Sequence, residues 1–152
     1  MVSRVLAAGV VALAAGLSSV SAEEAALGKL ELRPGVNLEV TELKRVPDKN
    51  LVMARFAVAN AGSDAVTMEA LGLRNGNDLA RVSLIDFKNG KQYDIGSGYG
   101  TCLCSHVTSD DAIEPGQRKA YWAMYGNPPA DVTKVAVMVR GLPPVFDVPL
   151  GK

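Results

Sequence analysis

Residues 82–95 have the sequence VSLIDFKNGKQYDI. Two runs rich in β-branched, aliphatic and aromatic residues flank the pair Asn89-Gly90. This pair suits a type I′ turn best, because both central residues of that turn adopt positive φ. The stretch therefore predicts a β-hairpin whose two strands are joined at Asn89-Gly90.

Apolar residues at every second position extend this strand character along the chain. Such alternation places successive side chains on opposite faces of a strand, one of which is buried. It occurs in residues 36–41, 51–60, 118–125 and 132–140, and shorter strands are expected at 65–71 and 145–150. Seven or eight strands, separated by turn signals at short intervals, predict an all-β fold built as a two-sheet antiparallel sandwich. An open barrel is the alternative.

Two local expectations follow from the same patterns. In residues 118–125 the alternation places Trp122 on one face and Tyr121 and Tyr125 on the other, and we expect Trp122 to be the large core residue. The segment Gly96–Gly100 holds three glycines and is expected to be a mobile loop.

Composition excludes some classes of protein. The chain has 152 residues, of which 48% are hydrophobic, and its 16 Lys and Arg balance 16 Asp and Glu. A disordered chain has fewer apolar residues, and a protein that binds nucleic acid by neutralising phosphates is clearly basic. The length fits a single domain. We therefore expect one globular domain that does not bind nucleic acid.

The first 22 residues resemble a secretory signal peptide. Arg4 precedes an apolar run from Val5 to Leu17, and Ser21-Ala22 completes a small-x-small cleavage pattern. The run is shorter than the roughly 20 residues that a helix needs to cross a membrane. We therefore expect a signal peptide at 1–22, a lead-in at 23–35 and the sandwich domain at 36–152. The processed protein is expected to be periplasmic or secreted, with no membrane span.

The distinctive chemistry lies in one short segment, Cys102-Leu103-Cys104-Ser105-His106, which holds both cysteines and the single histidine. Residues two apart in a flat strand are roughly 6.6 Å apart. A disulfide therefore needs a bend between Cys102 and Cys104, and an oxidising compartment favours that bond. Free thiols with redox activity are a second interpretation. A soft-metal site for copper(I) or zinc, with Cys102, Cys104 and His106 as ligands, is the third.

Catalysis has weaker support. Ser105 and His106 are adjacent, so in a strand they point to opposite faces and do not form a nucleophile and base pair. The sequence has no Gly-x-Ser-x-Gly, P-loop or thioredoxin-type motif. We therefore expect a protein that is not an enzyme and has no cofactor, with copper as the alternative.

Several weak motifs occur in an order that resembles a known group. They are a strand ending at Asn60 before Gly62-Ser63, the hairpin at 84–93, Glu114-Pro115-Gly116 before Trp122, and Pro128-Pro129 before Val135. Over residues 36–150 this order is similar to the secreted immunoglobulin-like domains of bacteria, including the DUF4352 group.

The resemblance implies an immunoglobulin-like sandwich and an exported binding or interaction module without catalytic residues. Its partner is expected to be another protein of the bacterial cell envelope or the extracellular space. Loops at one end of a sandwich commonly carry the contacts. The candidate binding loop therefore holds Tyr99, Ser105 and His106.

Overall fold

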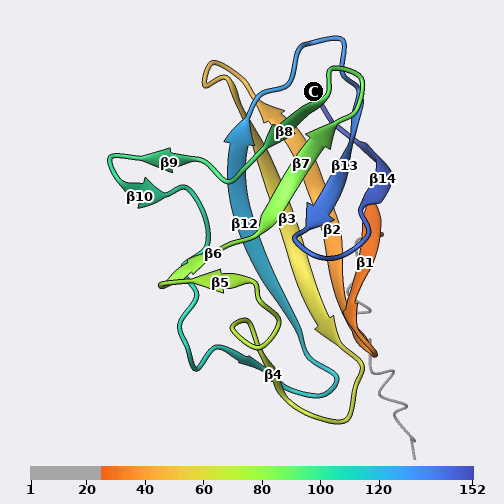
Figure 1. Ribbon diagram of the computed structural model, residues 1–152, viewed down its shortest axis with the longest axis vertical. Coiled ribbons are helices and arrows are strands. Elements are labelled where there is room, and N and C mark those ends of the chain that lie inside the picture. The colour runs from red at the N-terminus through yellow and green to blue at the C-terminus, as the bar shows by residue number, and fades with distance from the viewer. Residues whose placement is uncertain (1–24) are drawn as a thin grey trace, which may run out of the picture.

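The computed structural model describes residues 25–152, and the signal peptide expected at 1–22 lies outside this range. Two four-stranded antiparallel sheets form the body (Figure 1). The first has the order β1 (Gly28–Arg33), β2 (Val36–Val46), β3 (Leu51–Asn60) and β12 (Arg118–Gly126). The second has the order β14 (Val145–Pro149), β13 (Lys134–Val139), β7 (Val82–Asp86) and β8 (Lys91–Tyr93).

Three two-stranded ladders complete the described chain. They pair β4 (Val66–Thr67) with β11 (Ala112–Ile113), β5 (Arg74–Asn75) with β6 (Asp78–Leu79), and β9 (Ser97–Gly98) with β10 (Thr101–Cys102). Residues 25–152 contain no helix, and so none that is long and apolar enough to span a membrane. The expected all-β antiparallel fold is confirmed.

The apolar faces of the two sheets share one core. Leu38 and Phe56 from the first sheet belong to the same buried cluster as Leu84 and Val137 from the second. Each of these side chains is at most 1% exposed. Burying side chains of this size contributes roughly 1.5–3 kcal/mol each, so the contact between the two sheets stabilises the fold.

The strand order is immunoglobulin-like. In that fold, strands A, B and E lie in one sheet and strands C, F and G in the other. Here β2, β3 and β12 take the places of A, B and E, and β7, β13 and β14 take those of C, F and G. The next strand, β8, extends the second sheet beside β7.

Two long connections between the sheets form a side lobe. Residues 61–81 link β3 to β7, and residues 94–117 link β8 to β12. The two connections pair with each other through β4 and β11, and through a backbone bridge between Asp78 and His106. Segments far apart in sequence therefore meet beside β12, which is where the candidate site lies (Figure 1).

The first strand begins earlier than expected. Residues 28–33 form β1, inside the segment that the sequence analysis treats as a lead-in. Arg33 pairs with Val36, so Pro34-Gly35 is a two-residue turn, and Gly35 has a φ of 78°. Pro followed by a residue with positive φ fits a type II turn. The Pro-Gly pair therefore joins two strands.

The expectation for Trp122 is wrong. Trp122 is 39% exposed, whereas Tyr121 and Tyr125 are 5% and 0% exposed. The Tyr125 hydroxyl donates to the carbonyl of Val82 at 3.2 Å, and the Tyr121 hydroxyl donates to the Asp111 carboxylate at 3.0 Å. Because both phenols have a partner, burying the tyrosine face leaves no hydroxyl unsatisfied.

The hairpin at 82–95 is confirmed, but its turn differs from the expected type I′. Asp86 pairs with Lys91, so the loop has four residues, and of the pair Asn89-Gly90 only Gly90 has a positive φ, 63°. The Asp86 carboxylate is buried and accepts hydrogen bonds from the Asn89 backbone N–H at 3.1 Å and from its side-chain amide at 2.7 Å. These two bonds hold the longer loop.

Candidate functional site

A projecting hairpin dominates the side lobe. We name residues 95–105 the arm; it contains β9 and β10 and extends sideways from the body (Figure 1). Gly98 pairs with Thr101, so Tyr99-Gly100 is a two-residue turn. Their φ angles are 53° and 79°, both positive as a type I′ turn requires. The segment expected to be an irregular mobile loop is thus a short hairpin.

Backbone hydrogen bonds fasten the base of the arm to the edge of β12. Gly96 N–H donates to the Met124 carbonyl at 2.7 Å, and Met124 N–H donates to the Leu103 carbonyl at 2.8 Å. Ser105 N–H donates to the Trp122 carbonyl at 2.8 Å. Both legs of the arm therefore add to the first sheet, and only the tip leaves it.

The glycine at the base permits close packing. A Cβ on Gly96 would lie 3.3 Å from the Met124 carbonyl oxygen and 3.6 Å from a methyl of Leu103. The first separation is tighter than ordinary contact. A side chain at this position would therefore push the arm away from β12.

The two cysteines are joined in the arm. Cys102 and Cys104 form a disulfide, and their Cα atoms are 5.3 Å apart. A flat strand would separate residues two apart by roughly 6.6 Å, so the chain bends at Leu103. Cys104 is buried and Cys102 is half-buried. The link closes a very small ring, which removes little entropy from the unfolded chain, so its main effect is on the local shape of the arm.

His106 does not join the cysteines. Among residues 25–152, the group of potential metal-ligating side chains consists of Asp78, Cys102 and Cys104, whose ligand atoms lie within 4.8 Å of one another. His106 is exposed, and its backbone bridges Asp78. Asp78 lies 24 residues before Cys102, on the other connection between the two sheets. No local pattern marks it.

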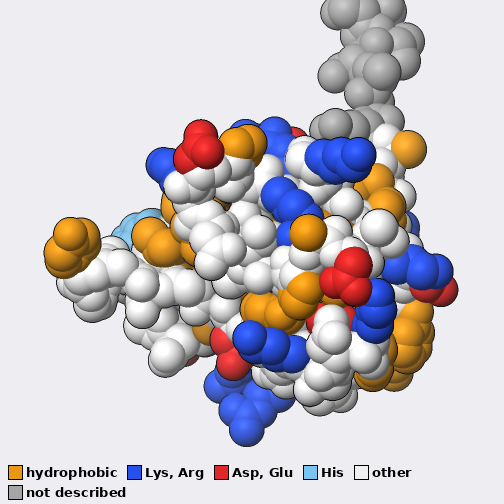
Figure 2. Space-filling model, turned by 90° about the horizontal axis from the view of Figure 1, so that it is seen from above, with side chains coloured by type: hydrophobic (Ala, Val, Ile, Leu, Met, Phe, Trp, Pro, Cys, Tyr) orange, Lys and Arg blue, Asp and Glu red, His pale blue; other side chains and the backbone are white. Residues whose placement is uncertain are grey.

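The two other expected binding residues have different roles. The Ser105 hydroxyl oxygen accepts a hydrogen bond from Trp122 N–H at 2.8 Å, so it supports the base of the arm. Tyr99 is fully exposed at the tip. Figure 2 shows the arm with a hydrophobic group at its outer end and the histidine nearer the body.

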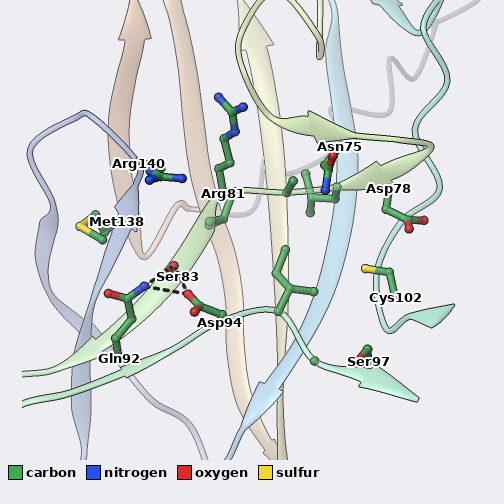
Figure 3. A pocket seen from close by; sticks show the side chains of 15 residues that line it. Asn75, Asp78, Arg81, Ser83, Gln92, Asp94, Ser97, Cys102, Met138 and Arg140 are labelled. Carbon is green, nitrogen blue, oxygen red and sulfur yellow. Dashed lines mark hydrogen bonds between the residues drawn. The ribbon is translucent and has the colours of Figure 1, made fainter. Parts of the chain in front are cut away.

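A groove of about 670 Å³ with both polar and apolar lining residues runs beside the arm. Cys102 and Asp78 lie on one side of it, and Gln92, Asp94 and Arg140 lie on the other (Figure 3). Asp94 accepts hydrogen bonds from the Gln92 amide and the Ser83 hydroxyl, each at 2.7 Å. These two bonds hold the pKa of Asp94 below its usual range. Two carboxylates, Asp78 and Asp94, and two arginines, Arg81 and Arg140, therefore line the groove.

A second exposed surface lies on the other sheet. The rings of Phe87 and Phe146 are 62% and 60% exposed and stack with centroids 5.5 Å apart. Two ion pairs flank them, Lys88 with Asp131 and Lys134 with Asp147. We name this surface the phenylalanine patch. The sequence pattern assigns Phe87 to a strand and does not predict this patch, whereas the structure places Phe87 in the hairpin loop.

Comparison with known proteins finds no matching family, no similar curated protein and no similar solved structure.

Proposed function

We propose that the chain is an exported, non-enzymatic binding module that contacts its partner, another protein of the bacterial cell envelope or the extracellular space, with the tip of the arm. The observation that carries the proposal is Tyr99, a fully exposed aromatic side chain held at positive φ. The apparent signal peptide supports export, and the immunoglobulin-like strand order fits the resemblance to secreted binding domains.

The backbone conformation of Tyr99 is energetically unfavourable. A bulky residue at positive φ is strained, by roughly 1–2 kcal/mol relative to the ordinary region. Its side chain buries nothing in the isolated chain, because it is fully exposed. Backbone strain without a gain in stability is typical of functional positions. Tyrosine is also among the residues that dominate the energy of protein interfaces.

The base of the arm reduces the cost of binding. Its hydrogen bonds to β12 and the Cys102–Cys104 link fix the arm before any partner arrives. A preformed loop loses less conformational entropy on association than a mobile one. The adjacent groove, with Asp94 and Arg140, offers charged groups to polar side chains of the partner.

Capture experiments test the proposal. The processed protein, carrying an affinity tag, is incubated with the native envelope fraction, and bound proteins are identified after cross-linking. We expect Tyr99→Ala to lose the specific partner. Phe146→Ala is the matched control, because it removes an exposed aromatic ring from the opposite sheet, and it should retain the partner. Loss of the partner by Phe146→Ala and not by Tyr99→Ala would contradict the proposal.

Export is tested separately. Intact-mass measurement of the protein from the periplasm or medium should give a chain that starts near Glu23. A full-length chain confined to the cytoplasm would contradict the export half of the proposal.

A further inference from the structure

We infer that reduction of the Cys102–Cys104 disulfide creates a zinc site whose ligands are the two thiolates and the carboxylate of Asp78. This site differs from the cysteine and histidine set that the sequence suggests. It also goes beyond partner binding, because it gives the side lobe a second, redox-dependent activity.

The distances fit a bound ion. The ligand atoms of Asp78, Cys102 and Cys104 already lie within 4.8 Å of one another. A tetrahedral zinc ion with Zn–S bonds of about 2.3 Å and a Zn–O bond of about 2.0–2.2 Å holds its ligand atoms about 3.5–3.8 Å apart. Once the S–S bond is opened, rotation of the two cysteine side chains brings the three atoms to that spacing.

The fold holds Asp78 near the sulfurs without help from the disulfide. Leu79 N–H donates to the Ser105 carbonyl at 3.1 Å, and Val107 N–H donates to the Asn77 carbonyl at 2.8 Å. These bonds flank the backbone bridge between Asp78 and His106. On the other side, Cys104 is bridged to Ala123 of β12. The framework of the site is therefore in place in both redox states.

Asp78 has no other electrostatic partner. Neither the ion pairs nor the side-chain hydrogen bonds formed among residues 25–152 involve its carboxylate, although the residue is only half exposed. By contrast, Asp86, Asp94 and Asp111 each accept hydrogen bonds. A carboxylate that lies within 4.8 Å of two sulfur atoms and forms no ion pair with the arginines of the same groove fits a metal ligand role.

The chemistry of Asp78 also separates the remaining alternatives. A cation offsets the charges of two thiolates and one carboxylate that lie this close together. The oxygen ligand favours zinc over copper(I), which prefers sulfur and imidazole ligands. The site therefore suits zinc better than copper(I).

The chemistry balances with a dithiol reductant. Two electrons from the dithiol open the S–S bond, the reductant becomes a disulfide, and Cys102 and Cys104 become thiols. Zinc binding then displaces one proton from each thiol. Because Cys102 and Asp78 line the groove, the fourth position of the ion faces solvent. The ion replaces the disulfide as the link that closes the bend at Leu103.

Cobalt(II) titration tests the inference, because thiolate-bound cobalt absorbs strongly in the near ultraviolet and zinc displaces it. The processed protein is reduced with a phosphine, kept under argon and titrated with Co²⁺ and then Zn²⁺. We expect one equivalent per chain with a thiolate-to-cobalt band, and no such band for the oxidised protein. Cys102→Ser and Cys104→Ser should abolish the band.

Asp78→Asn is the decisive variant, and it should bind zinc at least tenfold more weakly than the parent protein. His106→Ala and Asp94→Asn are matched controls, because one removes the histidine of the alternative set and the other an acid of the same groove. Both should change the affinity by less than twofold. The inference is overturned if Asp78→Asn binds zinc like the parent, if His106→Ala weakens binding as much, or if no thiolate band forms. Circular dichroism of each variant checks that the sandwich is retained.

Discussion

The hairpins β7–β8 and β9–β10 follow each other along the chain but differ in what holds them. The first has a four-residue loop that the buried Asp86 ties to the second sheet. The second has a two-residue turn in solvent and is fixed only at its base, where both legs pair with β12. The β7–β8 hairpin contributes to the core, and the β9–β10 hairpin exposes the side chain of Tyr99 to solvent.

The comparison shows that a turn sequence alone does not determine turn type. Asn89-Gly90 is favourable for a type I′ turn, yet pairing of Asp86 with Lys91 imposes a longer loop. Tyr99-Gly100 is a poor match for the same turn, yet both residues have positive φ because their legs are already fixed on β12. Register, which is set by long-range contacts, decides the turn.

Alkaline pH should affect the body most strongly. Burial raises the pKa of Tyr125 well above its usual value, and burial together with the Asp111 carboxylate does the same for Tyr121. The folded protein therefore retains the protons of these two tyrosines, and that of Tyr93, whose pKa burial also raises, at pH values where the unfolded chain releases them. The stability that these tyrosines contribute should be constant below pH 10 and fall above it by about 1.4 kcal/mol per pH unit for each tyrosine. Urea unfolding at several pH values measures this. Tyr125→Phe should show a shallower decline, and an identical slope would contradict the assignment.

Removing Asp86 should have the next largest effect. Asp86→Ala removes a buried carboxylate that accepts two hydrogen bonds from Asn89 of the exposed loop, and the expected loss is about 1–3 kcal/mol. Asp86→Asn keeps one acceptor oxygen and should cost less. The free energy of unfolding in urea gives both values. A change below 0.5 kcal/mol for Asp86→Ala, about the scatter of neutral surface substitutions, would show that the loop is not held by this side chain.

Paired glycine substitutions should distinguish the two hairpins. Gly90 and Gly100 have φ angles of 63° and 79° with open space around them, so alanine strains the backbone at each by roughly 1–2 kcal/mol. Gly90→Ala should lower global stability by about that amount. Gly100→Ala should mainly accelerate hydrogen exchange at Leu103 N–H, because the arm opens locally. If Gly90→Ala and Gly100→Ala lowered the global free energy of unfolding equally, the arm would unfold only together with the body.

The smallest effect is expected at the tip. Tyr99→Gly removes an exposed ring and releases the strain of positive φ, so the melting temperature should stay constant or rise slightly. Differential scanning calorimetry measures it. A clear fall in melting temperature would show that Tyr99 packs against the body and would weaken its assignment as a contact residue.

Local sequence patterns predicted where the strands lie, but not always which face of a strand is buried. Alternation in 118–125 separates two faces correctly, but it does not say which face is buried when both carry aromatic residues. Tyr125 is buried because Val82, 43 positions earlier, accepts its hydroxyl hydrogen bond. That acceptor belongs to the other sheet, and no sequence window around 118–125 contains it.

The candidate site also depends on long-range contacts that a local sequence window does not contain. Residue type alone singles out Tyr99 and the two cysteines, and the disulfide of the structure lies within the segment 102–106. Asp78 was not visible, because the pairing of two separate connections brings it there. Phe146 projects outward at a break in the register between β13 and β14, where Asp147 has a φ of 57°. A strand pattern assumes regular alternation and does not anticipate such a break.

The base of the arm has a further consequence for how this protein behaves at high concentration. An uncovered edge strand presents N–H and C=O groups that recruit strands from other molecules, a common route to aggregation. Here Gly96, Leu103 and Ser105 occupy those groups on β12. Deleting the whole arm to obtain a non-binding variant would leave the edge of β12 unpaired and prone to aggregation. Changing only Tyr99-Gly100 would remove the contact residue and keep the edge of β12 paired.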